Sequence, residues 1–254
     1  MKTEALILSS VLIMVPIIIS YKEKLELNRD IIVSMLRAVV QLLAVGYVLD
    51  FIFGLDKLIY TVILVLVMII NAAINTKKKG FTIESQVLIS FVSISVGTII
   101  TLGILISSKA IGYTPNEVIP VAGMIISNSM VAIGLSYRNL INNFKNNSIA
   151  VEVKLSLGAS IKEASDEIIR ESIKISIMPT IDSAKTLGIV SLPGMMTGLI
   201  LAGSSPLVAV KFQIMVTFMI LSSSSIATII ATYLSYKKFF NKRKQLKQIV
   251  AQID

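Results

Sequence analysis

The chain has 254 residues, 54% of them hydrophobic, and a mean hydropathy of +0.82. An ordinary soluble domain has roughly 45–50% apolar residues, so this composition predicts an integral membrane protein. The sequence contains no Cys and no His, which excludes disulfides, zinc fingers and an imidazole proton relay.

Apolar segments follow one another along the whole chain. A membrane-spanning helix needs about 20 mostly apolar residues, and seven segments approach or exceed that length: residues 5–21, 32–53, 58–75, 87–106, 119–141, 188–203 and 207–236. The first lacks a clear basic region and a small-residue cleavage site, so we expect a retained helix and not a signal peptide. The expected fold is all-α and polytopic, with a single transmembrane permease domain over residues 1–254.

Lysines and arginines concentrate in the connections after the first, third and fifth segments and in the tail after the seventh. By the positive-inside rule these parts face the cytoplasm, which puts the N-terminus outside and the C-terminus inside a plasma (inner) membrane. The basic tail suits an anchor to anionic lipid headgroups. The net charge of +9 is thereby explained without nucleic-acid binding, which we do not expect.

The connection over residues 142–185 is far longer than the others, and such connections usually have a function. Ser160 and Glu163 form a capping box, which predicts that a helix starts there. Apolar residues recur on one face of this helix and charged residues occupy the other, and Pro179 is expected to limit it. The members of the apolar face are Ile161, Ala164 and Ile168.

Two interpretations of this amphipathic helix remain open. It either lies in the headgroup layer or docks a cytoplasmic partner. Helices that lie on the membrane are usually rich in Lys and Arg on their polar face. Here Glu163 and Arg170 belong to a face of mixed sign, which favours docking.

Polar residues inside the predicted spans are candidates for a transport pathway. For any single amide the commoner role is a hydrogen bond between helices, worth roughly 0.6–2 kcal/mol, and Arg37 is near enough to the cytoplasmic end to snorkel. These candidates are Arg37, Gln41, Asn71, Asn128 and Gln213.

Acidic residues are absent from the centres of the predicted spans. Proton-driven carriers generally need a carboxylate or a His in the membrane, so the chain is expected to be a pore or a transporter powered by another chain.

The sixth segment contains Pro193 followed by Gly194. Proline removes one helical hydrogen bond and glycine tolerates the altered dihedral angles, so we expect a break at membrane depth. Such a break is tolerated where it is buried in protein or lines an aqueous cavity. A pathway or a dimer interface is therefore expected, with a packing kink as the alternative. Met195 and Met196 belong to the same candidate pathway, but as flexible packing and not as a metal site.

Three stretches, residues 36–53, 119–135 and 155–216, resemble the FetB family of ABC transporter permeases, which is associated with iron export in bacteria and with aluminium tolerance in plants. The run SLPGMMTGLILAG followed by SPLVAVKFQI is specific to that family, and the resemblance covers nearly the whole chain. It implies a permease without its own ATPase, acting as a homodimer with two copies of a cytoplasmic ATPase subunit. ATP and Mg²⁺ would be bound by that partner, and no cofactor is expected in this chain.

Permeases of binding-protein-dependent ABC systems dock their ATPase through a loop with a Glu and, six residues later, a Gly. Glu152 and Gly158 have this spacing, but Val153 and Lys154 replace the two alanines, and the usual Ile-x-Leu-Pro is missing. The resemblance thus implies a coupling role for a set of residues in the long connection. That set is Glu152, Gly158, Ser160, Glu163 and Arg170.

The resulting expectation is export of iron or a related metal. A hard cation prefers oxygen ligands, and Asp50 and Glu117, near the outer ends of two spans, are the candidate metal ligands. The alternatives are an ABC permease for another solute, such as a metabolite or a metal chelate, and a passive channel or scaffold. A membrane-embedded enzyme is not expected, because the spans hold no nucleophile with an acid/base partner.

Overall fold

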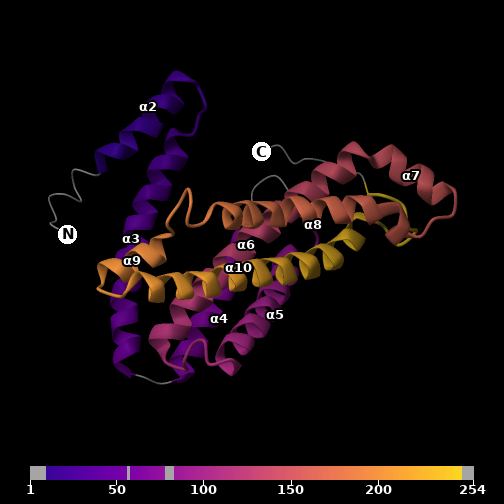
Figure 1. Ribbon diagram of the computed structural model, residues 1–254. Helices are drawn as coiled ribbons and strands as arrows, with labels where there is room; N and C mark the ends of the chain where they lie inside the picture. Colours follow the sequence, from indigo (N-terminus) through magenta and orange to yellow (C-terminus); the bar gives the residue numbers. More distant parts are fainter. Residues whose placement is uncertain (1–9, 56–57, 78–82, 248–254) are drawn as a thin grey trace. The chain divides into compact units, whose positions relative to one another are not determined.

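The computed structural model describes residues 10–55, 58–77 and 83–247, and in these ranges the chain is helical (Figure 1). The extended pairings found there are two isolated bridges. The predicted all-α class is therefore confirmed. The chain divides into two compact units, Met1–Asp56 and Lys57–Asp254, which are described separately.

The first unit contains a short 3-10 turn, Ser10–Ile13, that continues into α2 (Met14–Lys22) and is followed by α3 (Asn28–Leu55). The backbone amide of Leu27 donates to the hydroxyl of the buried Ser20 at 3.1 Å, which closes the turn between α2 and α3. Helix α3 is long and apolar enough to cross a membrane, as predicted for residues 32–53. Of the first predicted span, residues 5–9 lie outside the described residues, and the rest is helical.

Four further helices of the second unit are long and apolar enough to cross a membrane. They are α4 (Leu58–Asn75), α5 (Gln86–Ser107), α6 (Pro115–Asn146) and α10 (Pro206–Ser235), which the 3-10 turn η2 (Tyr236–Phe239) follows. They confirm four predicted spans. Helix α6 is central and packs against α4, α5 and α10.

Small residues allow close packing between α5 and α10. A Cβ added to Gly97 would lie 3.2 Å from the backbone oxygen of Ser223 and 3.4 Å from Cβ of Ala227. Close backbone approach is a common basis of helix association in membranes. A hydrogen bond of 2.7 Å between the hydroxyls of Ser136 and Thr232 joins α6 to α10 in the same core.

The long connection contains α7 (Ser148–Ser156) and α8 (Ile161–Thr186). The capping box at the start of α8 is confirmed: the Ser160 amide donates to Glu163 Oε2 at 2.8 Å, and the Glu163 amide donates to Ser160 Oγ at 3.3 Å. Ala164 and Ile168 are buried, as the apolar face predicted. The expected limit at Pro179 is wrong, because the helix continues to Thr186. Packing of α8 against α6 and α10 offsets the one hydrogen bond that proline removes.

The sixth predicted span, residues 188–203, is not a continuous helix. A turn with a bridge between Leu187 and Ser191 comes first, and α9 (Gly194–Leu201) then has only eight residues. Eight residues rise about 12 Å, too little to cross a membrane. Pro193 lies at the N-cap of α9 and so precedes this helix instead of breaking it. The left-handed φ of +80° at Gly188 makes the turn possible.

The cytoplasmic location of residues 142–185 stays a prediction. Helix α8 packs along both α6 and α10, and in Figure 1 it lies side by side with α10, with α7 near one end and α9 toward the other. Thr180 and Ala184 line a cavity together with Ala132, near the middle of α6. The second half of α8 therefore lies beside two of the helices that are long and apolar enough to cross a membrane. Near the end of α8, Lys185 and Asp182 pair at 2.8 Å, and both side chains are exposed.

Candidate functional site

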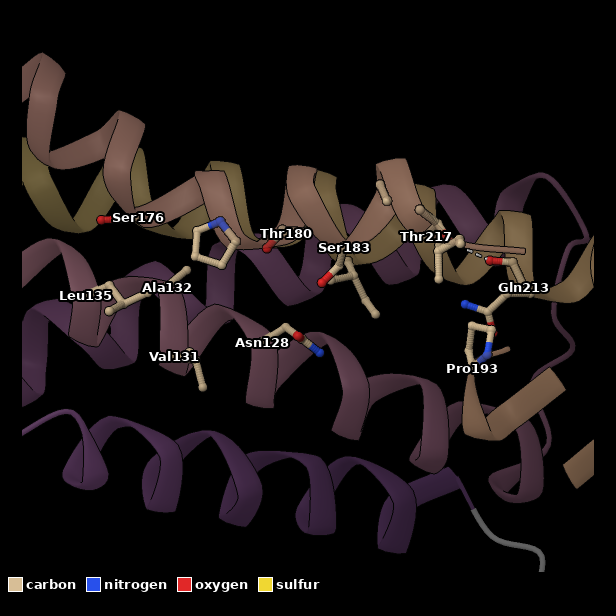
Figure 2. Close-up of a pocket in the computed structure, with 14 residues that line it drawn as sticks. Asn128, Val131, Ala132, Leu135, Ser176, Thr180, Ser183, Pro193, Gln213 and Thr217 are labelled. Atoms are coloured by element: carbon tan, nitrogen blue, oxygen red, sulfur yellow. Dashed lines mark hydrogen bonds between the residues drawn. The ribbon is translucent and has the colours of Figure 1, made fainter. Parts of the chain in front are cut away.

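A cavity of about 300 Å³ opens between α6, α8 and α10 (Figure 2). At about 30 Å³ per water molecule, this is room for roughly ten waters. We call it the polar groove, because amides and hydroxyls from all three helices line it. Its polar side chains are Asn128, Ser176, Thr180, Ser183, Gln213 and Thr217.

The helical repeat explains how these side chains reach one groove. On α8 the hydroxyls of Ser176, Thr180 and Ser183 are spaced four and three residues apart, so they share one face of the helix. On α10, Gln213 and Thr217 are four residues apart, and the Thr217 hydroxyl donates to the Gln213 backbone oxygen at 2.9 Å. The groove is therefore built from regular helices.

The amides of Asn128 and Gln213 point into the same space from α6 and α10 (Figure 2). Asn128 is half-buried, and its Nδ2 donates to the Met124 backbone oxygen at 2.8 Å. Gln213 Oε1 is buried and has no hydrogen-bond partner among the described residues. A buried acceptor without a donor costs about 1–3 kcal/mol. In this arrangement of the helices the oxygen is closed off from the groove and stays without a donor from the described part of the chain.

Three of the predicted pathway residues come together here, namely Asn128, Pro193 and Gln213. Gly194 and Met196 follow in α9, and Met195 packs on an apolar cluster that includes Val121 and Met219. Sequence reasoning missed the hydroxyl residues of α8 because they were assigned to the cytoplasm. Their helical spacing was the signal that could have revealed them.

The remaining pathway candidates lie elsewhere. Asn71 is exposed on α4, where Asn75 Nδ2 donates to its Oδ1 at 2.6 Å. Arg37 and Gln41 are exposed on α3 of the first unit. Their roles in transport stay predictions.

The candidate metal ligands also lie outside the groove. Both carboxylate oxygens of Glu117 have local donors: the Gly112 amide donates to one, and the Thr114 hydroxyl donates to the other at 3.2 Å. Asp50 is exposed on α3. Across the part of the chain that the structure describes, no group of three or more acidic residues could hold a metal ion. Metal binding by Asp50 and Glu117 stays a prediction.

The five coupling candidates all lie in the hairpin of α7 and the first half of α8, which we call the docking hairpin. Gly158, between the two helices, has φ +90°, a conformation that strongly favours glycine. Lys154 on α7 lies 3.8 Å from Glu167 on α8, and Arg170 pairs with Asp166 at 2.8 Å. The exposed Glu152 completes a charged surface.

Glu163 anchors this surface. Its carboxylate accepts from the Ser160 amide, and this bond together with the Ser160 hydroxyl lowers the pKa of Glu163. The cap therefore favours the ionised form of this side chain.

Comparison with known proteins adds independent findings. Residues 3–240 match the family described as "Uncharacterised protein family (UPF0014)". The chain is 51% identical to the "Probable iron export permease protein FetB" of Escherichia coli strain K12, over 98% of this chain and 96% of that protein. It is 38% identical to the "UPF0014 membrane protein YjkA" of Bacillus subtilis, over 96% and 98% of the two chains. It is 34% identical to the "Protein ALUMINUM SENSITIVE 3" of Arabidopsis thaliana, over 96% and 89%. No solved structure matches.

Proposed function

The chain belongs to the UPF0014 family, and from that premise we propose that it is the permease subunit of an ABC transporter that exports iron or a related metal. The name of its Escherichia coli relative supports iron as the cargo. The observation that carries the mechanism is the continuity of α8. This single helix of 26 residues begins in the docking hairpin and ends at the polar groove.

In this proposal a separate cytoplasmic ATPase, with its own ATP and Mg²⁺, binds the docking hairpin of each of two permease copies. The excess of basic residues in alternate connections supports a cytoplasmic hairpin and an inner-membrane location. Helix α8 is about 39 Å long at 1.5 Å per residue. It is thus long enough to carry a displacement at the membrane surface to the groove.

The groove would alternate between two arrangements that bind the cargo with different affinity, since only such a difference lets ATP binding drive release. Movement of α8 changes the distance between its hydroxyls and the amides of Asn128 and Gln213. The unpaired Gln213 Oε1 would accept a hydrogen bond from the cargo in one arrangement only.

The test is reconstitution of the permease and its ATPase in vesicles with the ATPase facing outward. We expect iron to accumulate inside only when ATP is added and only when both subunits are present. Iron movement by the permease alone, without nucleotide hydrolysis, would mean a passive channel and would contradict the proposal.

The same experiment, carried out with variants of the docking hairpin, tests whether the ATPase binds there. Glu163→Arg reverses a charge of the hairpin, and we expect it to abolish co-purification of the ATPase together with transport. Ser160→Ala weakens the cap by about 1 kcal/mol without reversing charge, so it should reduce both much less than Glu163→Arg does. Glu23→Arg, in the connection between α2 and α3, is the matched control for charge. Unchanged co-purification of Glu163→Arg would refute the docking assignment.

A further inference from the structure

A second cavity, of about 150 Å³, lies between α4, α5 and α6. We call it the inner cavity. Asn75, Gln86, Tyr137 and Arg138 give it polar walls. It has no part in the docking hairpin, and sequence reasoning did not identify it.

The inner cavity adjoins the polar groove. Val131 and Leu135, one turn apart on α6, line both cavities, and Val131 is 57% exposed. From Asn128 in the groove to Arg138 in the inner cavity, α6 rises about 15 Å. The two cavities are thus neighbours along α6, separated by these two apolar side chains, and we call the pair of cavities the polar track.

Most polar groups of the inner cavity are already paired within the protein. Gln86 Nε2 donates to the Thr76 backbone oxygen at 2.8 Å, and the Tyr137 and Ser90 hydroxyls share a hydrogen bond of 3.0 Å. Arg138 is exposed and forms no ion pair in the described part of the chain. Its guanidinium is therefore available to a ligand.

The only formal charge on the described walls of the two cavities is positive. Among the described residues that line the groove or the inner cavity, Arg138 is the only one with a formal charge, and none is a carboxylate. Protein sites that take a divalent cation out of water usually combine charged ligands, above all carboxylates, with neutral oxygens such as amide carbonyls. The described lining of the two cavities offers only neutral oxygens, and its one charged group, the Arg138 guanidinium, repels a free cation.

We propose that the cargo is iron already held in an anionic chelate of the hydroxycarboxylate type, and not the aqua ion. This inference rests on the proposed function. Arg138 pairs with a free carboxylate of the chelate, since a planar guanidinium matches a carboxylate in a bidentate geometry. When the chelate moves on to the polar groove, about 15 Å along α6, the hydroxyls of α8 and the NH₂ groups of Asn128 and Gln213 donate to its outer oxygens. The groove, with room for roughly ten waters, accommodates a metal together with its ligands.

The test uses vesicles with the permease and its ATPase, and compares radioactive iron supplied as ferric citrate with iron supplied as the ferrous aqua ion under ascorbate. We expect ATP-dependent accumulation at least about tenfold faster from ferric citrate. Arg138→Gln should slow that accumulation at low chelate concentration by about tenfold, the effect of losing one charged hydrogen-bond partner. Arg138→Lys keeps the charge and should recover part of the rate. Arg29→Gln removes a guanidinium elsewhere and should change nothing.

The outcomes separate the inference from its premise. Equal or faster transport of the ferrous aqua ion would overturn the inference and leave iron export standing. Competition by free citrate as strong as that by ferric citrate would also overturn it, because the cargo would then be the organic anion. No transport of iron in either form would refute iron export itself, and the inference with it. Unchanged kinetics of Arg138→Gln, with the ATPase still co-purifying, would remove Arg138 from the site.

Discussion

The two halves of α8 have the same backbone conformation in different surroundings. The first half begins with the capping box of Ser160 and Glu163, and its apolar face, which includes Ala164 and Ile168, is buried in the core. The second half is more exposed, and its small hydroxyl residues face the polar groove. One rigid element can therefore present charge to a partner at one end and hydrogen bonds to a cargo at the other.

The largest effect on transport should come from replacing Gln213, one of the two amide side chains in the polar groove. Gln213→Leu eliminates side-chain hydrogen bonding at this position. A site that binds its substrate through a hydrogen bond discriminates strongly against a complex in which that bond is missing. We expect ATP-dependent iron accumulation to fall at least about tenfold, equivalent to about 1.4 kcal/mol. Thermal unfolding should show unchanged or higher stability, because the variant also removes the unpaired buried Oε1.

Met219→Leu is the control for this variant. Met219 is buried on the same helix but packs in an apolar cluster outside the groove, and the exchange conserves volume. Its transport should match that of the unmodified protein. If Gln213→Leu also transports normally, the groove is a packing feature and the contrast between the halves of α8 has no functional meaning.

A smaller effect is expected at the other end of the helix. Gly158→Ala forces a side chain into a backbone conformation with φ +90°, which costs about 1–2 kcal/mol. The docking hairpin should bind the ATPase more weakly in a titration, while cargo binding to the isolated permease stays unchanged. Gly103→Ala, in a helix with no atom within 4 Å of the added Cβ, should bind the ATPase normally. Equal weakening in both variants would contradict a special role for Gly158.

The same contrast explains what could be predicted from the sequence. The capping box involves neighbours three residues apart, so its geometry follows from local chemistry, and the apolar face of Ala164 and Ile168 follows from helical periodicity. The path of α8 beyond Pro179 depends on α6 and α10, which no local pattern reveals. Only part of the groove could be predicted from the sequence. Asn128 and Gln213 are 85 residues apart in the chain, and only the tertiary structure brings them to the same cavity.

The smallest effect concerns pH and separates the two halves most directly. The Ser160 amide and hydroxyl hold the pKa of Glu163 below its ordinary value. Because the folded-state pKa is the lower one, the cap stabilises the helix fully above the unfolded-state pKa, and this stabilisation is lost as the pH falls through the folded-state pKa. In hydrogen exchange corrected for intrinsic rates, the amides of residues 160–164 should lose protection on acidification, whereas those of residues 176–184 should not. Glu163→Gln retains the acceptor of the capping box without the titration, so its first turn should be insensitive to acid. An equal acid response at both ends of α8 would show that the helix opens as one unit, and an acid response of the first turn in Glu163→Gln would show that a group other than Glu163 causes it.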